Sequence, residues 1–351
     1  MPPIRVAIVD DSAFVRELLT ALISADPAFE VVGAACDPFE ARDLIKATRP
    51  DVLTLDIEMP RMDGLTFLGN LMRLRPIPTV MVSTLTERGA DVTLRALELG
   101  AVDYIAKPSG TSPEDFAAAG EELLDKLKTA ARARVRASQP AAPRARPPAL
   151  VTAPSARHAG FLLAIGGSTG GTEAIREVIE ALPADAPGTV ITQHIPAMFS
   201  RRFAERLNDC SAMTVHEAED GQPILQGHAY VAPGGYHLVV ARGTNRWICR
   251  LTQSEQVHRQ RPAVDVMFES VVRHAGANAI GVVLTGMGAD GGAGLLQMRE
   301  AGAHTIAQDE ASSVVWGMPG TAVRLGAAVE VLPLGQIAQR LRKVFAARRV
   351  A

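Results

Sequence analysis

The stretch Ile4-Arg-Val-Ala-Ile-Val-Asp10-Asp11 places two acidic residues directly after a run of apolar residues that favour strands. A second apolar run, residues 52–55, is followed by Asp56, and a third, residues 102–106, is followed by Lys107. Polar side chains that follow parallel strands meet at one edge of the sheet. We therefore expect three carboxylates and one lysine to lie together at the carboxyl ends of three strands.

Short apolar runs alternate with helical segments throughout the first 125 residues. Strands are predicted at residues 4–9, 31–35, 52–55, 79–83 and 102–105, and helices at residues 13–23, 38–47, 65–74 and 88–99, with a further helix beginning near residue 113. Because the strands are continuously apolar, helices should cover both faces of their sheet. This half of the chain is predicted to be a doubly wound α/β domain with a five-stranded parallel sheet.

A change in composition separates this domain from the rest of the chain. Residues 126–172 contain no Asp or Glu but eight Lys or Arg, and five prolines fall between residues 140 and 154. Such a stretch cannot bury a core and tends to be extended, so residues 126–157 are predicted to be a basic Pro/Ala/Arg linker. The two domains are therefore expected at residues 1–125 and 158–348. The basic run could instead bind nucleic acid, but it lacks interleaved aromatic residues.

Composition excludes several classes of protein. The 351 residues carry a formal net charge of −2, which gives no general attraction to nucleic acid or to an acidic membrane surface. The cysteines Cys36, Cys210 and Cys249 are too far apart for a zinc knuckle and fit reduced thiols. No apolar run is long enough to span a membrane, and Asp10 comes too early for a signal peptide. A cytoplasmic location without membrane insertion is expected.

The second half of the chain repeats the alternation with a different insert. Strands are predicted at residues 161–165, 189–192, 279–284 and 304–307, and helices at residues 173–181, 200–207 and 292–300. Between residues 212 and 252, short runs separated by Gly or Pro predict a β-hairpin. We predict a three-layer α/β/α domain with a mostly parallel sheet and a β-hairpin insert.

The strand-end residues of the first domain suit a phosphorylation switch. Carboxylates as close as Asp10, Asp11 and Asp56 would repel one another, and a hard cation such as Mg²⁺ relieves that repulsion while orienting a phosphoryl donor. Asp56 would be the nucleophile that accepts the phosphoryl group. Lys107 would contact the transferred oxygens, and Ser83, at the end of its strand, would donate a hydrogen bond. Taken alone, each acid could equally be a helix cap.

A serine nucleophile is predicted at the end of the first strand of the second domain. In Gly166-Gly-Ser168-Thr-Gly-Gly171, small neighbours allow a sharp turn that exposes the serine hydroxyl near a helix N-terminus. His194 follows the next strand and could accept the serine proton, while Asp290 could orient the histidine ring. The three residues form a candidate Ser-His-Asp triad. No cluster of His, Cys and acidic residues with metal-ligand spacing accompanies them, so the chemistry of this triad is expected to need no cofactor.

An alternative hypothesis uses the glycines around Asp290. Gly286, Gly288 and Gly291 match the G-x-G-x-x-G pattern of a dinucleotide-binding turn, and Asp309 follows about twenty residues later. That pattern normally opens a domain, whereas this one comes late and leaves the serine and histidine unused. A dinucleotide-binding enzyme is thus the rival prediction, and a binding module with a vestigial triad is a third.

Residues 1–125 resemble a response-regulator receiver domain, which has a flavodoxin-like fold. The resemblance is carried, in family order, by the acidic pair, Asp56, Ser83, Tyr104 and Lys107-Pro108. It implies a Mg²⁺ site formed by Asp11, Asp56 and the backbone carbonyl of Glu58, with Asp10 nearby. It also implies that a histidine kinase donates the phosphoryl group, and that Ser83 and Tyr104 shift together when Asp56 is modified.

Residues 158–345 resemble the catalytic domain of the chemotaxis protein-glutamate methylesterase family, the CheB family. The motifs that carry the resemblance are Gly166-Gly-Ser-Thr-Gly-Gly171, Gln193-His-Ile-Pro196, Tyr230-Val-Ala-Pro-Gly-Gly-Tyr-His237, Arg261-Pro262 with Asp265, Thr285-Gly-Met-Gly-Ala-Asp-Gly291, Gln308-Asp-Glu310 and Val314-Val-Trp-Gly-Met-Pro319. The resemblance implies hydrolysis of glutamyl γ-methyl esters on the cytoplasmic helices of chemoreceptors, releasing methanol, and deamidation of receptor glutamines. It also implies that Met287 supplies an oxyanion-hole N–H and that Thr169 neighbours the nucleophile. We further expect the unphosphorylated receiver to inhibit the esterase.

Overall fold

The computed structural model describes residues 2–59, 61–83, 87–107, 113–135 and 160–347. The chain divides into two units, Met1–Ala141 and Ala142–Ala351. Most of the predicted linker, from residue 136 onward, lies outside the described residues, as does Pro108. No helix in the described ranges combines the length and the apolar character that a membrane crossing requires.

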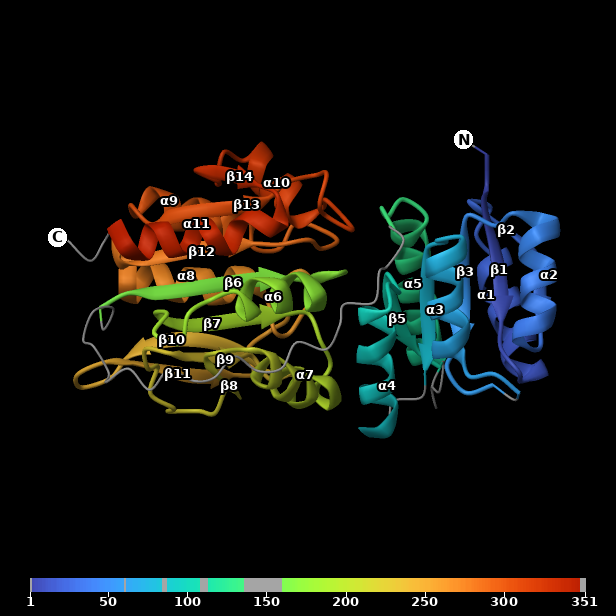
Figure 1. The fold of residues 1–351 in the computed structure, drawn as a ribbon, viewed down its shortest axis with the longest axis horizontal. Coiled ribbons are helices and arrows are strands. Elements are labelled where there is room, and N and C mark those ends of the chain that lie inside the picture. The colour runs from blue at the N-terminus through green and yellow to red at the C-terminus, as the bar shows by residue number, and fades with distance from the viewer. Residues whose placement is uncertain (1, 60, 84–86, 108–112, 136–159, 348–351) are drawn as a thin grey trace. The chain divides into compact units, whose positions relative to one another are not determined.

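The first unit alternates strands and helices from its first residues to its last helix (Figure 1). Its strands are β1 (Ile4–Val9), β2 (Phe29–Ala35), β3 (Val52–Asp56), β4 (Thr79–Ser83) and β5 (Asp103–Ala106). Its helices are α1 (Ala13–Ser24), α2 (Pro38–Thr48), α3 (Gly64–Leu74), α4 (Glu87–Glu98) and α5 (Pro113–Ala130). The last helix continues five residues past residue 125 and buries Leu127 and Ala130, because apolar side chains persist among its lysines.

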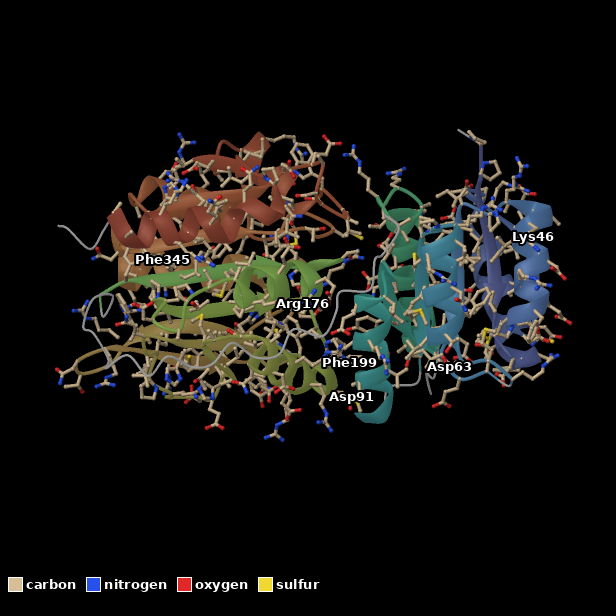
Figure 2. The ribbon with its side chains drawn as sticks, viewed as in Figure 1. Lys46, Asp63, Asp91, Arg176, Phe199 and Phe345 are labelled. Atoms are coloured by element: carbon tan, nitrogen blue, oxygen red, sulfur yellow. The ribbon has the colours of Figure 1, made fainter. Side chains whose placement is uncertain are left out.

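The sheet of the first unit has the order β2-β1-β3-β4-β5, and every pairing in it is parallel. The central strands β3 and β4 are buried along their whole length, as continuous apolar runs predict. The order of the strands switches at β1, because β2 lies on one side of it and β3 on the other. The carboxyl ends of β1 and β3 therefore flank the point where ligands bind in such sheets. Asp63, which Figure 2 labels, begins α3 beside this edge by accepting a hydrogen bond from the Thr66 N–H at 2.7 Å.

The second unit contains a larger sheet. Its strands are β6 (Leu162–Gly167), β7 (Gly188–Gln193), β8 (Thr214–Glu217), β9 (His228–Val231), β12 (Ala279–Val283), β13 (His304–Gln308) and β14 (Glu330–Leu332), with a separate pair β10 (His237–Arg242) and β11 (Trp247–Thr252). Its helices are α6 (Gly171–Glu180), α7 (Ala197–Cys210), α8 (Val264–Ala275), the 3₁₀ turn η2 (Gly276–Asn278), α9 (Gly292–Glu300), α10 (Met318–Arg324) and α11 (Leu334–Ala347).

The seven strands of this sheet have the order β14-β13-β12-β6-β7-β9-β8 and pair in parallel. The predicted hairpin is present as the antiparallel pair β10 and β11. The first part of the predicted insert is different, because β8 and β9 join the parallel sheet at its edge. Each has four residues between turn-forming neighbours, which made them look like part of a hairpin.

Helices pack on both faces of the larger sheet, giving three layers (Figure 1). Helix α6 packs against α7 and α11, and helix α8 packs against α9 and the β10 strand. Figure 2 labels Phe199 of α7 and Phe345 of α11, whose side chains are buried at 0% and 2% exposure. The central strands β6, β7 and β12 therefore end in turns that a rigid, covered sheet holds in place.

Candidate active site and phosphorylation site

Ser168 lies on the turn between β6 and α6. Its N–H donates to the carbonyl of Thr285 at 3.0 Å, and its carbonyl accepts from the Gly171 N–H at 2.6 Å. The turn must be built from small residues, because a Cβ on Gly171 would lie 2.2 Å from Oε1 of Gln193. The partly exposed serine is thus fixed by its own backbone, three residues before the helix begins.

Gln193 is the last residue of β7, the neighbouring strand, and His194 directly follows it. The His194 N–H donates to the carbonyl of Gly167 at 3.2 Å, which continues the sheet pairing to the site. Nε2 of Gln193 donates to the carbonyl of Ser168 at 2.8 Å and to that of His194 at 3.3 Å. The buried amide therefore joins the serine turn to the histidine turn. Sequence reasoning gave Gln193 no such role.

Asp290 lies in the turn before α9, and its side chain packs against the first turn of helix α8. The residue is buried, at 1% exposure. Its Oδ2 accepts from the Val264 N–H at 2.6 Å, and its Oδ1 accepts from the N–H groups of Asp265 and Gly291, each at 2.9 Å. Burial raises the pKa of Asp290, but hydrogen bonds from His194 and from these N–H groups outweigh it, so the pKa is lowered. The carboxylate therefore stays ionised inside the protein.

The three side chains form one hydrogen-bonded line. Nε2 of His194 lies 2.7 Å from Oδ2 of Asp290, and Nδ1 lies 3.1 Å from Oγ of Ser168. Because an ionised carboxylate can only accept, Nε2 carries the hydrogen and Nδ1 presents its lone pair to the serine. This ring orientation exchanges the two nitrogens relative to the chymotrypsin-type triad, but supplies the same base to the nucleophile.

Two of the three glycines of the G-x-G-x-x-G pattern after β12, Gly286 and Gly291, are closely packed by other protein atoms. A Cβ on Gly286 would lie 2.3 Å from Sδ of Met318 and 2.8 Å from Cβ of Ser168. This glycine is needed for close packing of the serine turn, and Asp290 in the same stretch binds His194. Asp309, the acid of the rival dinucleotide pattern, accepts hydrogen bonds from Ser312 instead. The geometry therefore gives the rival reading no support.

Two further predicted residues lie beside the serine: Met287, the predicted oxyanion-hole donor, and Thr169, the predicted neighbour of the nucleophile. Met287 directly follows Gly286, whose Cα packs on the serine side chain. Thr169 follows the serine and is buried, and its carbonyl accepts from Oγ1 of Thr285 at 3.0 Å. Thr169 is therefore held by the same strand end that accepts the Ser168 N–H.

The acidic residues of the first unit meet at the carboxyl ends of β1 and β3. Nζ of Lys107 lies 2.8 Å from Oδ2 of Asp56 and 3.1 Å from Oδ2 of Asp10. Carboxylate oxygens of Asp10, Asp11 and Asp56 lie within 4.8 Å of one another. Burial, reinforced by the charge of Asp10, raises the pKa of Asp56 to about 6 in spite of Lys107.

This acidic site fits a hard divalent cation. Oδ2 of Asp10 is buried without a hydrogen-bond partner among the described residues, and it forms an ion pair with Lys107. Two buried carboxylates, the exposed Asp11 and nearby carbonyl groups form the oxygen-rich donor set that Mg²⁺ prefers. Glu58 lies in the loop two residues after Asp56, so its carbonyl belongs to the same loop.

The predicted switch residues lie on the two strands beyond β3. Ser83 ends β4 at 3% exposure, and its carbonyl accepts from the Lys107 N–H at 2.8 Å. Tyr104 lies on β5 with its side chain buried at 8% exposure, and Nζ of Lys126 lies 5.0 Å from the centre of its ring. Burial raises the pKa of Tyr104 well above its usual value, so its hydroxyl stays protonated.

A further cluster adjoins Asp290. One ligand atom from each of His258, Asp265 and Asp290 lies within 4.8 Å of the others. The expectation that no such cluster accompanies the triad was therefore wrong. Spacing along the chain could not reveal it, because it combines a loop, the start of α8 and the turn before α9. The only sequence signal was the pairing of Arg261-Pro262 with Asp265 in one motif.

Comparisons with known proteins identify the family of each half of the chain. The family described as CheB methylesterase matches residues 163–341, and the response regulator receiver domain matches residues 6–119. A relative from Xanthomonas campestris pv. campestris, named protein-glutamate methylesterase/protein-glutamine glutaminase 1, is 57% identical and aligns over 99% of both chains. This chain belongs to the CheB methylesterase family.

Other CheB relatives are similar over nearly the same length. One from Pseudomonas aeruginosa, a protein-glutamate methylesterase/protein-glutamine glutaminase 2, is 55% identical over 99% of this chain and 98% of its own. The crystal structure of the Thermotoga maritima CheB methylesterase catalytic domain aligns with a TM-score of 0.52 and 36% identity. It covers 53% of this chain and 98% of that domain. The predicted family, fold class and hydrolase class are thereby confirmed, whereas the residue roles stay predictions.

Proposed function

We propose that this CheB-family chain is a phosphorylation-activated protein-glutamate methylesterase. Its substrates would be the γ-methyl esters of glutamate on the cytoplasmic helices of methylated chemoreceptors, and it would also deamidate receptor glutamines. The observation that carries the proposal is the hydrogen-bonded line from Ser168 through His194 to Asp290. The names of the relatives support the substrate class.

The proposed reaction begins at the serine hydroxyl. Oγ of Ser168 attacks the γ-carbonyl carbon while Nδ1 of His194 takes the hydroxyl proton. The tetrahedral intermediate collapses, the ester C–O bond breaks, and the histidine returns its proton to the departing methoxide, which leaves as methanol. A water then hydrolyses the acyl-serine by the same proton route and releases the free glutamate. With glutamine, ammonia leaves in place of methanol.

Charge develops at two positions in this reaction. The imidazolium form of His194 lies 2.7 Å from the ionised Asp290, which stabilises it as the proton arrives. The negative charge on the substrate oxygen requires N–H donors near Ser168, and we assign the backbone N–H of Met287 to this role, with Thr169 bordering the same position. Removing one such donor typically costs about 10²–10³-fold in rate.

In the receiver domain, we propose that Asp56 accepts a phosphoryl group from a chemotaxis-type histidine kinase. Asp11, Asp56 and the carbonyl of Glu58 would hold Mg²⁺, with Asp10 beside it. Bound there, the ion neutralises the carboxylates and orients the phosphoryl donor. Lys107, already 2.8 Å from Asp56, would contact the transferred oxygens. Ser83 and Tyr104 would then move together and change the face that restrains the esterase.

The test measures methanol release from a chemoreceptor whose glutamates carry γ-methyl esters. Ser168→Ala should lower the rate by about 10⁴-fold or more, and His194→Ala should do the same, with little added loss in the double variant. Ser254→Ala, at an exposed serine outside the site, is the matched control and should match the wild type. Methanol release by Ser168→Ala at the wild-type rate would contradict the acyl-enzyme mechanism.

Two additions extend this test to the receiver. A small phosphodonor with Mg²⁺ should raise the wild-type rate, and Asp56→Asn should abolish that response. In a fragment that begins near residue 150, EDTA should leave ester hydrolysis unchanged. Loss of the fragment's activity in EDTA would assign a catalytic metal to the His258, Asp265 and Asp290 cluster.

A further inference from the structure

A second histidine contacts the carboxylates behind the triad. Nε2 of His258 lies 2.9 Å from Oδ2 of Asp265 and 4.0 Å from Oδ1 of Asp290. The side chains of Asp265 and Asp290 are 7% and 2% exposed, whereas that of His258 is 43% exposed. His258 can therefore exchange its proton with solvent while it contacts two buried acids.

His258 is held at this place by a tight two-residue turn. Val257 and Gln260 exchange backbone hydrogen bonds of 3.2 and 2.9 Å across it. The φ angles of His258 and Arg259 are 53° and 61°, in the left-handed region where Gly and Asn are usual. Because non-glycine residues are strained in this region, the turn needs a stabilising contact. The hydrogen bond from His258 to Asp265 provides one.

Asp265 joins the two helices whose first turns surround Asp290. Its N–H donates to Oδ1 of Asp290 at 2.9 Å, and its own Oδ1 accepts from the Gly294 N–H at 2.7 Å in the first turn of α9. Asp290 lies between these contacts, two residues before α9 begins. Any movement of the Asp265 carboxylate would therefore be transmitted to the acid that orients His194.

We propose that His258 and Asp265 form a positioning dyad for the triad acid, Asp290. This inference rests on the proposed esterase function. Asp265 fixes the position of Asp290, and His258 donates its Nε2–H to Oδ2 of Asp265 and so offsets part of the charge of that carboxylate. Asp290, held in this way, presents Oδ2 to Nε2 of His194.

The electrostatics of the cluster agree with this assignment. Burial, together with the nearby charge of Asp290, raises the pKa of Asp265, as expected for a second acid that needs a partner. The titratable groups that face His258 are Asp265 from α8 and Asp290 from the turn before α9, and His194 lies beyond Asp290. On its own turn, His258 is followed by Arg259.

The proposal predicts that the two substitutions shift the pH dependence of the activity in opposite directions. His194 must be neutral to accept the serine proton, so activity falls at low pH as its ring is protonated. Removing His258 takes away the hydrogen bond that offsets the charge of Asp265, so more negative charge remains behind Asp290. This favours the imidazolium form of His194 and moves the acid limb of the pH profile to higher pH. Removing the charge of Asp265 moves the acid limb of the pH profile to lower pH. A nearby charge of this kind should shift the limb by about 0.5–1 pH unit.

The experiment compares full-length variants in EDTA, using a peptide that carries a glutamyl γ-methyl ester as the probe. The pH profile of kcat/KM for methanol release is measured for His258→Asn, Asp265→Asn and the double variant. Asn suits the left-handed turn, so the first change preserves the local backbone. Arg259→Lys is the matched control on the same turn and keeps its charge. NMR titration of the His194 ring in each variant gives a readout that does not depend on activity.

The expected result is an upward shift in His258→Asn, a downward shift in Asp265→Asn, a profile near the wild type in the double variant, and no shift in the control. Unchanged profiles in both single variants, or shifts in the same direction, would overturn the dyad. Failure of the proposed function looks different, because the wild type would then release no methanol or Ser168→Ala would remain active. The NMR titration would still report the dyad in that case.

Discussion

Asp290 has two roles at once in this chain. Its carboxylate orients His194, and it also accepts the first two N–H groups of helix α8, where Ala263 offers no side-chain cap. A helix N-terminus carries unsatisfied donors and partial positive charge, so a buried carboxylate there is stabilised in its ionised form. The residue proposed to orient the base is therefore also the capping group of a core helix.

Asp290→Asn should therefore lower both activity and stability. With its tautomer no longer fixed, His194 becomes a poor base, and we expect a loss of about 10³–10⁴-fold in kcat, smaller than that of Ser168→Ala. In the variant, an NH₂ group replaces one of the oxygens that accept backbone N–H groups, so two donors would face each other. This should also lower the free energy of unfolding by about 1–3 kcal/mol. Kinetics and urea unfolding measure the two effects, with Asp209→Asn on the exposed face of α7 as the control. An unfolding free energy equal to that of the wild type would argue against the capping role.

Asp56 should make the metal-free receiver domain less stable at neutral pH. Its pKa in the folded protein is raised to about 6, whereas an unfolded carboxyl titrates near 4. As pH falls through 6, the folded state takes up a proton that the unfolded state does not, so stability rises as pH falls. In EDTA, Asp56→Asn should melt above the wild type at pH 7.5, and the gap should narrow toward pH 5. Calorimetry of the full chain tests this, and a gap that widens on acidification would contradict it.

At the scale of elements, the active site is a set of strand-end turns locked to one another. The β6 turn and the β7 end are joined by the side chain of Gln193, and the space for that amide exists because residues 167 and 171 are glycines. Precise turns of this kind position catalytic groups better than free loops do.

Gly171→Ala should therefore disrupt catalysis without touching a catalytic side chain. The new Cβ would meet Oε1 of Gln193 at 2.2 Å, so the amide must leave its place between the carbonyls of Ser168 and His194. We expect kcat to fall by about 10-fold or more, since small misplacement of reacting groups is costly. Gly160→Ala, where an added Cβ meets nothing within 4 Å, is the control. Equal kinetics in the two variants would show that the amide link is not needed.

Pattern reasoning recovered most elements but not the contacts between them. The strands of the receiver were predicted correctly because short, continuously apolar runs are typical of strands that helices cover on both faces of the sheet. Strands β8 and β9 were misplaced because four residues with turn-forming neighbours fit a hairpin as well as an edge. Gln193 and His258 were assigned no role, because hydrogen bonds such as that of His258 to Asp265 arise only when distant turns meet.

At the scale of the whole molecule, each unit has a complete sheet of its own. Removing one unit therefore leaves the other with all its strands. Helix α5 buries Leu127 and Ala130, so a clean deletion of the receiver must extend beyond Ala130.

Deleting residues 1–135 should raise the basal methylesterase rate above that of the unphosphorylated full chain. We propose that the receiver inhibits the esterase through an interface of modest area. Such an interface contributes only a few kcal/mol to the inhibited state, and phosphorylation, which adds nearly two negative charges, can offset that free energy. Asp56→Asn in the full chain should stay at the low basal rate in the presence of a phosphodonor. A truncated chain that is no faster than the intact one would mean that the receiver activates the esterase instead.

The order of strands in the larger sheet also sets the order in which the protein can acquire activity during synthesis. Strand β6 is made early but pairs with β12, whose first residue, Ala279, follows Leu162 by more than a hundred positions. The receiver sheet is complete once Ala106 has emerged from the ribosome, whereas Asp290 and the carbonyl that holds the Ser168 turn come from residues 285–290. Domains fold as units in the order of their synthesis. The proposed regulator can thus fold before the proposed triad is complete, and the proposed inhibition would be in place when the esterase first becomes active.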